Sequence, residues 1–210
     1  MIRVLIAEDH AIVREGVKRI MADTPDIVVA GEAGSGAELL RTVRTGHWDV
    51  VLMDLALPDM SGLELLPELR REYPDLPVLV LSMYPEEQYA VRAVKSGAAG
   101  YVHKGNPPDE LITALRIVAG GKRYISAGTA ACLAAHVDTL ADKPPHETLS
   151  NREYQVLCLL AGGHRVSDIA RELALSVKTV STFRTRILEK LGLRHNAELT
   201  RYALQHGLVE

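Results

Sequence analysis

The sequence predicts an α/β fold with a doubly wound, five-stranded parallel sheet, followed by a small all-α domain of four helices. Over the first part of the chain, short β-branched runs alternate with segments whose apolar residues recur at helical spacing. Runs that are apolar throughout are typical of parallel strands covered by helices on both faces. From Leu149 onward the pattern changes, and capping residues mark the ends of helical segments.

We expect strands, in chain order, at 3–7 (RVLIA), 26–33 (DIVVAGEA), 48–54 (WDVVLMD), 77–82 (PVLVLS) and 100–103 (GYVH). The segments between them have apolar side chains three and four residues apart, which predicts helices there. Ligands of such sheets bind at the carboxyl ends of the strands. The residues that follow each strand are therefore the first candidates for a functional site.

Five polar side chains stand at those strand ends: Glu8, Asp9, Asp54, Ser82 and Lys104. Each alone has an ordinary structural explanation, such as a helix cap, a solvated strand end or a surface lysine. Together they are unusual, because two carboxylates 4 Å apart repel by about 4 kcal/mol at an effective dielectric near 20. Oxygen ligands with open positions favour Mg²⁺, which commonly joins carboxylates to a phosphate. We expect Mg²⁺ and a phosphoryl group on Asp54 to occupy this rim, with Ser82 and Lys104 binding the phosphoryl oxygens.

The composition indicates a soluble, cytoplasmic protein. The chain has 210 residues and is 47% hydrophobic, which suits one large or two small domains. The first apolar run is cut off by Glu8 and Asp9, and no later run reaches the roughly 18 residues of a membrane span. We expect no membrane contact.

The charge is distributed unevenly along the chain. Residues 1–149 carry 15 basic and 21 acidic side chains, whereas residues 150–210 carry 9 and 6. Adjacent prolines at 144 and 145 cannot continue a helix and favour an extended connection. We expect one domain at 1–122, a partly helical linker at 123–146 and a second domain at 147–210.

Residues 1 to about 120 resemble the flavodoxin-like receiver domain of two-component response regulators. The resemblance rests on the pair Glu8-Asp9, the segment MDLALPDMSGLEL around Asp54, the position of Ser82, and GAAGYVHKG around Lys104. It implies that Asp54 accepts a phosphoryl group from a phosphohistidine on a sensor histidine kinase.

The same resemblance assigns roles to the other residues of the rim. It implies that Asp9 binds Mg²⁺ directly, Glu8 through water, Asp54 through a carboxylate oxygen and Ala56 through its backbone carbonyl. It also implies a switch in which the Ser82 hydroxyl moves toward the phosphoryl group and the Tyr101 ring follows it inward. Two departures are a glutamate at position 8, where aspartate is commoner, and Gly105 where many receivers have proline. The second departure removes the usual reason to expect a cis peptide bond after Lys104.

Helix signals are clear in the last domain. Ser150 and Glu153 form a capping box, and Gly162 and Gly163 end the helix that follows. We expect a second helix over about 167–174 and a third, capped by Ser176, that runs to about Leu191. A fourth is expected over 196–209.

The third of these helices is amphipathic. At about 100° per residue, an apolar face and a polar, uncharged-to-basic stripe lie on nearly opposite sides. The apolar face consists of Val180, Phe183, Ile187 and Leu191. The stripe consists of Lys178, Ser181, Thr182 and Thr185, flanked by Arg184, Arg186 and Lys190. A solvated surface helix has the same pattern, but short polar groups beside cations are also what a helix in a DNA major groove needs.

The segments LSNRE and AGGHRVSDIARELALSVKTVSTFRTRILEKLGL resemble the LuxR-type helix-turn-helix, and with the receiver they place the chain among NarL/FixJ-type response regulators. The resemblance implies that Lys178, Ser181, Thr182 and Thr185 face DNA bases. Many relatives have a basic residue at the position of Ser181.

The fourth helix is expected to serve both packing and assembly. Its apolar residues Leu199, Ala203 and Leu204 partly complete the small core, and in the family this helix also pairs two DNA-bound copies. We therefore expect a homodimer on two-fold related half-sites of double-stranded DNA.

The main hypothesis is a phosphorylation-switched transcription factor, with no enzymatic activity beyond its own phosphorylation and dephosphorylation. RNA polymerase is a further expected partner. An aspartyl-phosphate phosphatase is an alternative, but such enzymes carry a second aspartate two residues after the nucleophile, where this chain has Ala56. A third reading keeps DNA binding and gives the first domain a sensory role without phosphorylation. The sequence leaves open whether phosphorylation relieves masking of the basic domain or drives receiver dimerisation.

Overall fold

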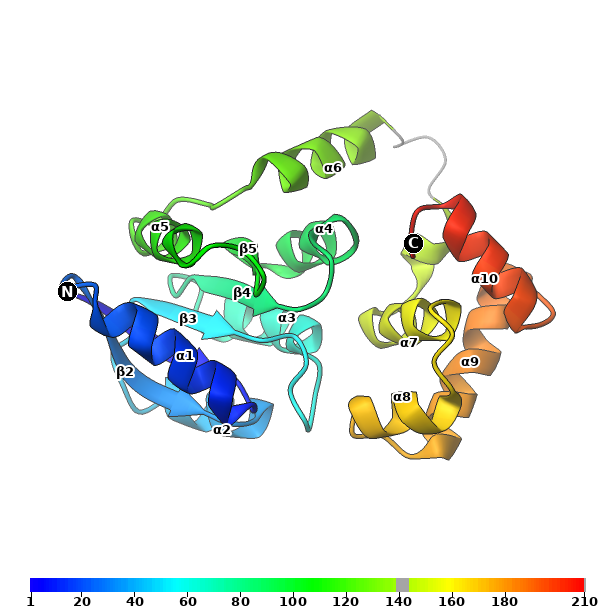
Figure 1. Ribbon diagram of the computed structural model, residues 1–210, viewed down its shortest axis with the longest axis horizontal. Helices are drawn as coiled ribbons and strands as arrows, with labels where there is room; N and C mark the ends of the chain where they lie inside the picture. Colours follow the sequence, from blue (N-terminus) through cyan, green and yellow to red (C-terminus); the bar gives the residue numbers. More distant parts are fainter. Residues whose placement is uncertain (139–143, 210) are drawn as a thin grey trace. The chain divides into compact units, whose positions relative to one another are not determined.

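The computed structural model describes residues 1–138 and 144–209, without the side chains of 134–138 (Figure 1). The chain forms two units, Met1–His136 and Val137–Glu210. Within the described residues, no helix is long and apolar enough to cross a membrane.

The first unit is built on a five-stranded, fully parallel sheet, as the sequence predicts. Its strands are β1 (Ile2–Ala7), β2 (Ile27–Ala33), β3 (Val50–Met53), β4 (Val78–Ser82) and β5 (Gly100–His103). The strand order is β2-β1-β3-β4-β5. In register, Ala7 pairs with Met53 and Ser82 with His103, so the residues that follow these strands meet at one edge of the sheet.

Five helices alternate with the strands (Figure 1). They are α1 (Ala11–Ala22), α2 (Gly36–Val43), α3 (Gly62–Glu72), α4 (Glu86–Ser96) and α5 (Pro108–Ala119). Helices α1 and α5 pack on one face, where Val17, Met21 and Leu115 join strand residues such as Ile6 and Leu52 in the core. Helix α2 packs against β1 and β2, and α3 packs between α2 and α4. The predicted doubly wound fold is confirmed.

A sixth helix, α6 (Ala127–Asp138), belongs to the first unit over most of its length. Before it, Tyr124 pairs with Gly100 and extends the sheet beyond β5. The Glu86 carboxylate at the start of α4 accepts hydrogen bonds from the hydroxyls of Ser126 and Thr129. These contacts tie the beginning of α6 to α4, so the first half of the predicted linker is packed onto the receiver-like unit.

The second unit is helical. From Pro144 to Val209 it contains a short 3₁₀ turn (Pro145–Thr148) and four helices, α7 (Asn151–Ala161), α8 (Val166–Glu172), α9 (Val177–Leu191) and α10 (Asn196–Gln205). The predicted capping box is present, because Ser150 Oγ accepts from Glu153 N and Glu153 Oε2 accepts from Ser150 N. Ser176 caps α9 as predicted. Helix α10 ends at Gln205 rather than Val209, since Gly207 takes a left-handed conformation with φ 63°.

The small core of this unit is formed by all four helices. Helices α9 and α10 pack against α7, and α8 packs against α9. The buried side chains include Val156, Leu157, Ile169, Val180, Ile187 and Leu199.

Candidate functional site

The polar residues predicted at the strand ends converge on one site. Glu8, Asp54 and Ser82 are 3%, 4% and 1% exposed. Backbone hydrogen bonds fix their positions: Asp54 N donates to the Ala7 carbonyl at 2.9 Å, and Lys104 N donates to the Ser82 carbonyl at 2.9 Å. Because the sheet holds the backbone on both sides, these side chains have little freedom to separate.

Lys104 links the two buried acids. Its Nζ atom lies 2.6 Å from Oδ2 of Asp54 and 2.6 Å from Oε2 of Glu8, and the lysine side chain is only 8% exposed. Burial opposes the charged form of Lys104, but the carboxylates of Asp54 and Glu8 outweigh burial, so the pKa of Lys104 is raised. Lys104 therefore stays protonated and compensates part of the negative charge.

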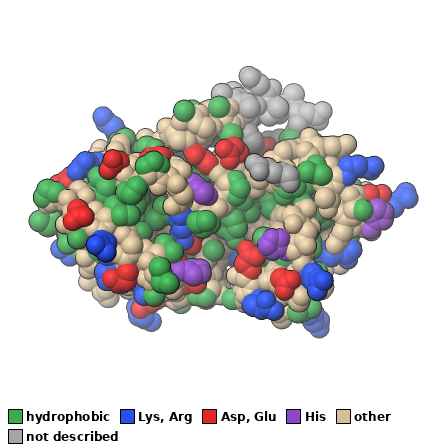
Figure 2. All heavy atoms as spheres, viewed as in Figure 1, with side chains coloured by type: hydrophobic (Ala, Val, Ile, Leu, Met, Phe, Trp, Pro, Cys, Tyr) green, Lys and Arg blue, Asp and Glu red, His purple; other side chains and the backbone are tan. Residues whose placement is uncertain are grey.

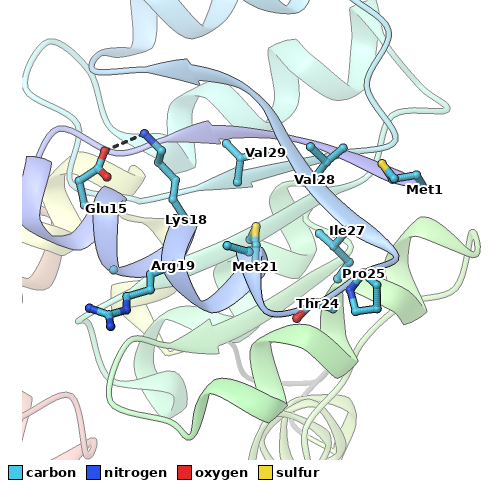
Figure 3. A pocket seen from close by; sticks show the side chains of 12 residues that line it. Met1, Glu15, Lys18, Arg19, Met21, Thr24, Pro25, Ile27, Val28 and Val29 are labelled. Atoms are coloured by element: carbon cyan, nitrogen blue, oxygen red, sulfur yellow. Dashed lines mark hydrogen bonds and ion pairs between the residues drawn. The ribbon is translucent and has the colours of Figure 1, made fainter.

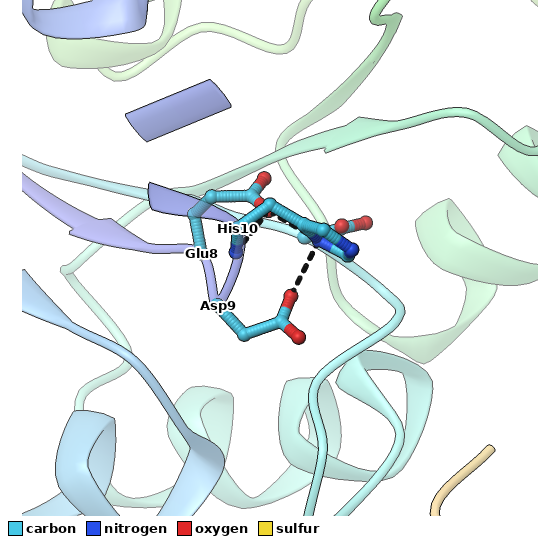
Figure 4. A group of neighbouring side chains, drawn as sticks. Glu8, Asp9 and His10 are labelled. Atoms are coloured by element: carbon cyan, nitrogen blue, oxygen red, sulfur yellow. Dashed lines mark hydrogen bonds and ion pairs between the residues drawn. The ribbon is translucent and has the colours of Figure 1, made fainter. Parts of the chain in front are cut away.

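Asp9 and His10 complete the acidic cluster, as Figure 4 shows. The His10 ring nitrogen Nδ1 lies 2.8 Å from Oδ1 of Asp9 and 3.1 Å from Oε1 of Glu8. Although His10 is close, Asp9 Oδ1 is a buried atom that accepts no hydrogen bond of normal geometry. Such an unsatisfied oxygen costs free energy unless another group binds it.

The cluster has the spacing of a metal site. One potential ligand atom each from Glu8, Asp9, His10 and Asp54 lies within 4.8 Å of all the others. Oxygens on opposite sides of an octahedral Mg²⁺ are about 4.2 Å apart, since each bond is about 2.1 Å. The carboxylates of Glu8, Asp9 and Asp54 in this cluster are the hard oxygen donors that a divalent cation such as Mg²⁺ prefers. Ala56 lies at the same rim, where its N–H donates to Asp54 Oδ1 at 3.2 Å.

Ser82 and Tyr101, the predicted switch pair, both lie inside the unit. The Tyr101 hydroxyl donates to the Tyr84 carbonyl at 2.5 Å, and the side chain is 1% exposed. Burial raises the pKa of Tyr101, so its phenol keeps its proton. The Tyr84 ring in turn stacks on Tyr89 of α4 with ring centroids 4.5 Å apart. The inward position of Tyr101 is thus connected to the start of α4.

The loop after Asp54 requires a glycine. A Cβ atom on Gly62 would lie 2.7 Å from the Asp54 carbonyl oxygen and 2.9 Å from Leu55 Cα. The Gly62 N–H donates to the Leu55 carbonyl at 2.9 Å, which closes the loop. Gly62 therefore allows α3 to start directly against the backbone of the acidic site. Among the described residues no peptide bond is cis, including the one after Lys104.

Two residues that support this rim were missed by the sequence analysis. Arg14 of α1 donates from Nη1 to the Glu8 carbonyl at 2.6 Å and pairs with Glu32 of β2 at 3.0 Å. Asp59 accepts hydrogen bonds from Gly36 N at 2.7 Å and Ala37 N at 2.8 Å, so it caps α2 from a distant loop. Neither contact has a periodic or local signal by which the sequence could have revealed it.

A separate cavity of about 860 Å³ lies between α1 and β2 (Figure 3). Its lining includes Met1, Lys18, Met21 and Ile27, and none of the acidic cluster. The site at the strand ends is thus defined by its charges and not by this cavity.

In the second unit, the predicted polar stripe of α9 is accessible to solvent. Lys178, Ser181, Thr182 and Thr185 are all exposed, and Arg186 beside them is exposed as well. Several Lys and Arg side chains project from this unit on the right of the view in Figure 2. The second unit by itself therefore leaves the stripe uncovered.

Two of the predicted flanking cations are held by their own domain. Arg184 donates from Nε to Oδ1 of Asn196 at 2.6 Å. Lys190 pairs with Oε2 of Glu153 at 2.7 Å, and Glu153 is only 3% exposed. Burial raises the pKa of Glu153, but bonds from Lys190 and Ser150 outweigh it, so the pKa is lowered. Arg184 and Lys190 thus have structural roles that their predicted place beside the stripe did not reveal.

The predicted dimerisation residues of α10 separate into two groups. Leu199 and Ala203 have no exposed surface and belong to the core of the domain, whereas Leu204 is 52% exposed. Leu199 and Ala203 thus serve the packing role expected of this helix and not the dimer contact, because a partner cannot reach a side chain that its own domain covers completely. Leu204 alone is accessible.

Comparison with known proteins agrees with this two-part architecture. Residues 4–116 match the response regulator receiver domain, and residues 147–203 match the bacterial regulatory proteins of the luxR family. The chain is 40% identical over 211 residues to the response regulator GacA of Pseudomonas viridiflava, covering 100% of this chain and 99% of GacA. It is 37% identical over 209 residues to the response regulator UvrY of Escherichia coli K12, covering 99% and 96% of the two chains.

Solved structures show the same likeness. RcsB of Salmonella enterica serovar Typhimurium, bound to promoter P1flhDC in the presence of the phosphomimetic BeF3⁻, is similar with a TM-score of 0.61 and 27% identity. The match covers 96% of this chain and 97% of RcsB. The chain is therefore a two-component response regulator of the NarL/FixJ type, in which a receiver domain is followed by a LuxR-type helix-turn-helix domain.

Proposed function

We propose that a sensor histidine kinase transfers a phosphoryl group to Asp54 in the presence of Mg²⁺, and that this transfer changes the binding of α9 to double-stranded DNA. The observation that carries the proposal is the position of Lys104, whose Nζ atom is 2.6 Å from both Asp54 and Glu8. The protonated Lys104 side chain already lies beside the phosphoacceptor. Its ammonium group can therefore exchange its contact with the Asp54 carboxylate for a contact with the incoming phosphoryl oxygens within the same site.

The chemistry requires little from the protein beyond positioning. A carboxylate oxygen of Asp54 attacks phosphorus, and the new O–P bond forms as the P–N bond to the kinase histidine breaks. The electron pair of that bond stays on the imidazole, which takes up a proton. Lys104 and the hydroxyl of Ser82 would bind the phosphoryl oxygens, and Tyr101 would hold the loop that carries Tyr84 in place.

The acidic cluster is the proposed Mg²⁺ site. Asp9 and Asp54 would supply oxygens directly, Glu8 would act through water and Ala56 would act through its backbone carbonyl. A bound Mg²⁺ supplies positive charge to the phosphoryl oxygens during transfer. The unsatisfied Oδ1 of Asp9 supports this assignment, because that atom is buried and has no hydrogen bond of normal geometry.

We infer that the protein is a phosphoacceptor and not a phosphatase. Ala56 stands two residues after Asp54, where a phosphatase of this mechanism needs an acid to protonate its leaving group. Hydrolysis of a phosphate monoester with repeated turnover would contradict this inference.

The proposed DNA-binding surface is the exposed stripe of α9. Lys178 and Arg186 would contact phosphates or guanine edges, and Ser181, Thr182 and Thr185 would face bases. The relative RcsB has been solved on a promoter, which supports the same use of this domain. Because a regulator of this kind acts on two-fold related half-sites, we propose a homodimer on DNA in which Leu204 contributes to the contact between copies. Contact with RNA polymerase stays a prediction.

The test measures the affinity of the full chain for an operator selected from a random duplex library. Native protein treated with Mg²⁺ and a small phosphodonor is expected to gain about tenfold in affinity, which is within the usual range of allosteric coupling. Asp54→Asn should show no gain. Equal responses of the native chain and Asp54→Asn would contradict the proposal. Phosphorylation could increase DNA affinity by relieving masking of the basic domain or by driving receiver dimerisation. The DNA affinity of isolated residues 146–210 distinguishes these two mechanisms, since relief of masking predicts tight DNA binding by this fragment and receiver dimerisation does not.

A further inference from the structure

An exposed apolar side chain stands at the start of the proposed DNA-recognition helix. Val177 is the first residue of α9 and is 54% exposed. The Ser176 cap fixes the first turn, because Ser176 Oγ accepts from Thr179 N at 3.0 Å. The N-terminal residues of a recognition helix are those that contact base edges in a helix-turn-helix protein. Val177 therefore occupies a position from which a base pair can be reached.

Val177 lies along the edge of the exposed stripe. Four residues of an α-helix turn by about 400°, so Val177 and Ser181 lie about 40° apart around the helix axis. The two are also joined directly, because Ser181 Oγ donates to the Val177 carbonyl at 2.9 Å. Val177 and Ser181 therefore lie on the same side of α9, and a duplex along the stripe has access to both.

The hydroxyl groups of the stripe donate hydrogen bonds to backbone carbonyls of α9. Thr182 Oγ1 donates to the Lys178 carbonyl at 3.0 Å, and Thr185 Oγ1 donates to the Ser181 carbonyl at 3.1 Å. With the hydrogens of all three hydroxyls directed at the helix backbone, the stripe presents acceptor oxygens, methyl groups and the single ammonium of Lys178. This surface suits base edges that carry amino or methyl groups.

We propose that Val177 recognises the C5-methyl group of a thymine in each half-site. Thymine is the base whose major-groove edge carries a methyl group, which can pack against the valine side chain. The proposal rests on the proposed function, in which α9 lies in the major groove.

The test uses the phosphorylated full chain and the selected operator. Each thymine is replaced in turn by deoxyuracil, which removes only the C5-methyl group. For the native chain, we expect that replacing one particular thymine in each half-site lowers the affinity for the operator about fourfold. This is the effect of removing one buried methyl group from the interface. In Val177→Ala this sensitivity should disappear at that thymine and persist elsewhere. Ile12→Ala, which removes an exposed apolar side chain from the first unit, should leave the whole uracil profile unchanged.

Two results would overturn the proposal: a native profile without a sensitive thymine, or a profile that Val177→Ala leaves unaltered. Far-UV circular dichroism and affinity for random DNA should be the same in Val177→Ala and native protein, which excludes misfolding. The variant Lys178→Ala tests whether α9 binds DNA at all, and so it distinguishes a failure of the thymine proposal from a failure of the proposed function. If the library yields no enriched sequence and Lys178→Ala binds DNA as the native chain does, α9 is not the DNA-binding helix and both proposals fail.

Discussion

Lys104 and Asp54 lie fifty residues apart in sequence, and their side chains meet at 2.6 Å between Nζ and Oδ2. The contact exists because β3 and β5 flank β4 in the sheet and end at the same edge. Lys104 also reaches Glu8 after β1, so one cation serves acids from two strands. The stability of the receiver unit and its proposed chemistry therefore depend on the same three side chains.

Removing Lys104 should destabilise the receiver unit. Lys104→Met leaves Glu8 and Asp54 buried without their cation, and we expect the free energy of unfolding to fall by about 3 kcal/mol. Asp54→Asn keeps the Lys104–Glu8 pair and should cost much less. Urea unfolding followed by the fluorescence of Trp48, the one tryptophan of the chain, reports on this unit. Equal stability of Lys104→Met and the native chain would show that the acids need no compensation.

Replacement by alanine should lower the stability of the receiver unit at Gly62 and raise it at Gly16. Gly62→Ala places Cβ 2.7 Å from the Asp54 carbonyl oxygen, so the backbone must shift, at a cost of about 2 kcal/mol. Gly16 lies in α1, where a Cβ atom would meet nothing within 4 Å, and Gly16→Ala should stabilise by about 1 kcal/mol. The same Trp48 unfolding assay compares the two variants. A neutral Gly62→Ala would mean that the loop after Asp54 adapts easily.

The Glu153–Lys190 pair should make the helix-turn-helix domain sensitive to acid. The folded pKa of Glu153 lies below its ordinary value of 4.5, because Lys190 and Ser150 outweigh burial. A depressed pKa contributes stability that is present above 4.5 and is lost as the pH falls through the folded pKa. Glu153→Gln should therefore be less stable than the native chain at neutral pH, and the difference should shrink in acid. Urea titrations monitored by NMR signals of α7 measure it; a difference independent of pH would contradict this linkage.

Lys178 and Lys190 should differ in what their removal changes. Lys178 is exposed on the stripe, so Lys178→Ala should weaken DNA binding and reduce its salt dependence without loss of stability. Lys190 pairs with Glu153, and its side chain is 42% exposed, so after allowance for solvent screening Lys190→Ala should cost about 1 kcal/mol of stability. Fluorescence anisotropy across a salt series, together with thermal unfolding, compares them. If Lys190→Ala weakened DNA binding without loss of stability, Lys190 would be a DNA contact and not a structural residue.

Local signals were sufficient for the elements and for the acids at the strand ends. The apolar run before Asp54 predicts a buried strand, and in a parallel sheet the residues after β1 and β3 must meet. The caps at Ser150 and Ser176 were equally predictable, because a cap and its target lie three residues apart.

Contacts between distant residues left no such signal. The bonds from Arg14 to the Glu8 carbonyl, from α2 to Asp59 and from α6 to Glu86 join segments whose separation has no period. Helical spacing places Leu199 and Ala203 together on one face of α10, but it cannot show that packing against α7 buries that face completely. The structural role of Lys190 was not predictable for the same reason, because its partner Glu153 lies 37 residues away in the sequence.

The most direct test of the proposed chemistry identifies the residue that carries the phosphoryl group. The full chain is incubated with Mg²⁺ and a small phosphodonor, and the acyl phosphate is reduced with borohydride, which converts a phosphorylated aspartate to homoserine for peptide mass spectrometry. We predict homoserine at position 54, dependent on Mg²⁺ and absent from Asp54→Asn. Equal phosphorylation of Asp54→Asn, or modification of the native chain at another carboxylate, would contradict the assignment of Asp54 as the phosphoacceptor.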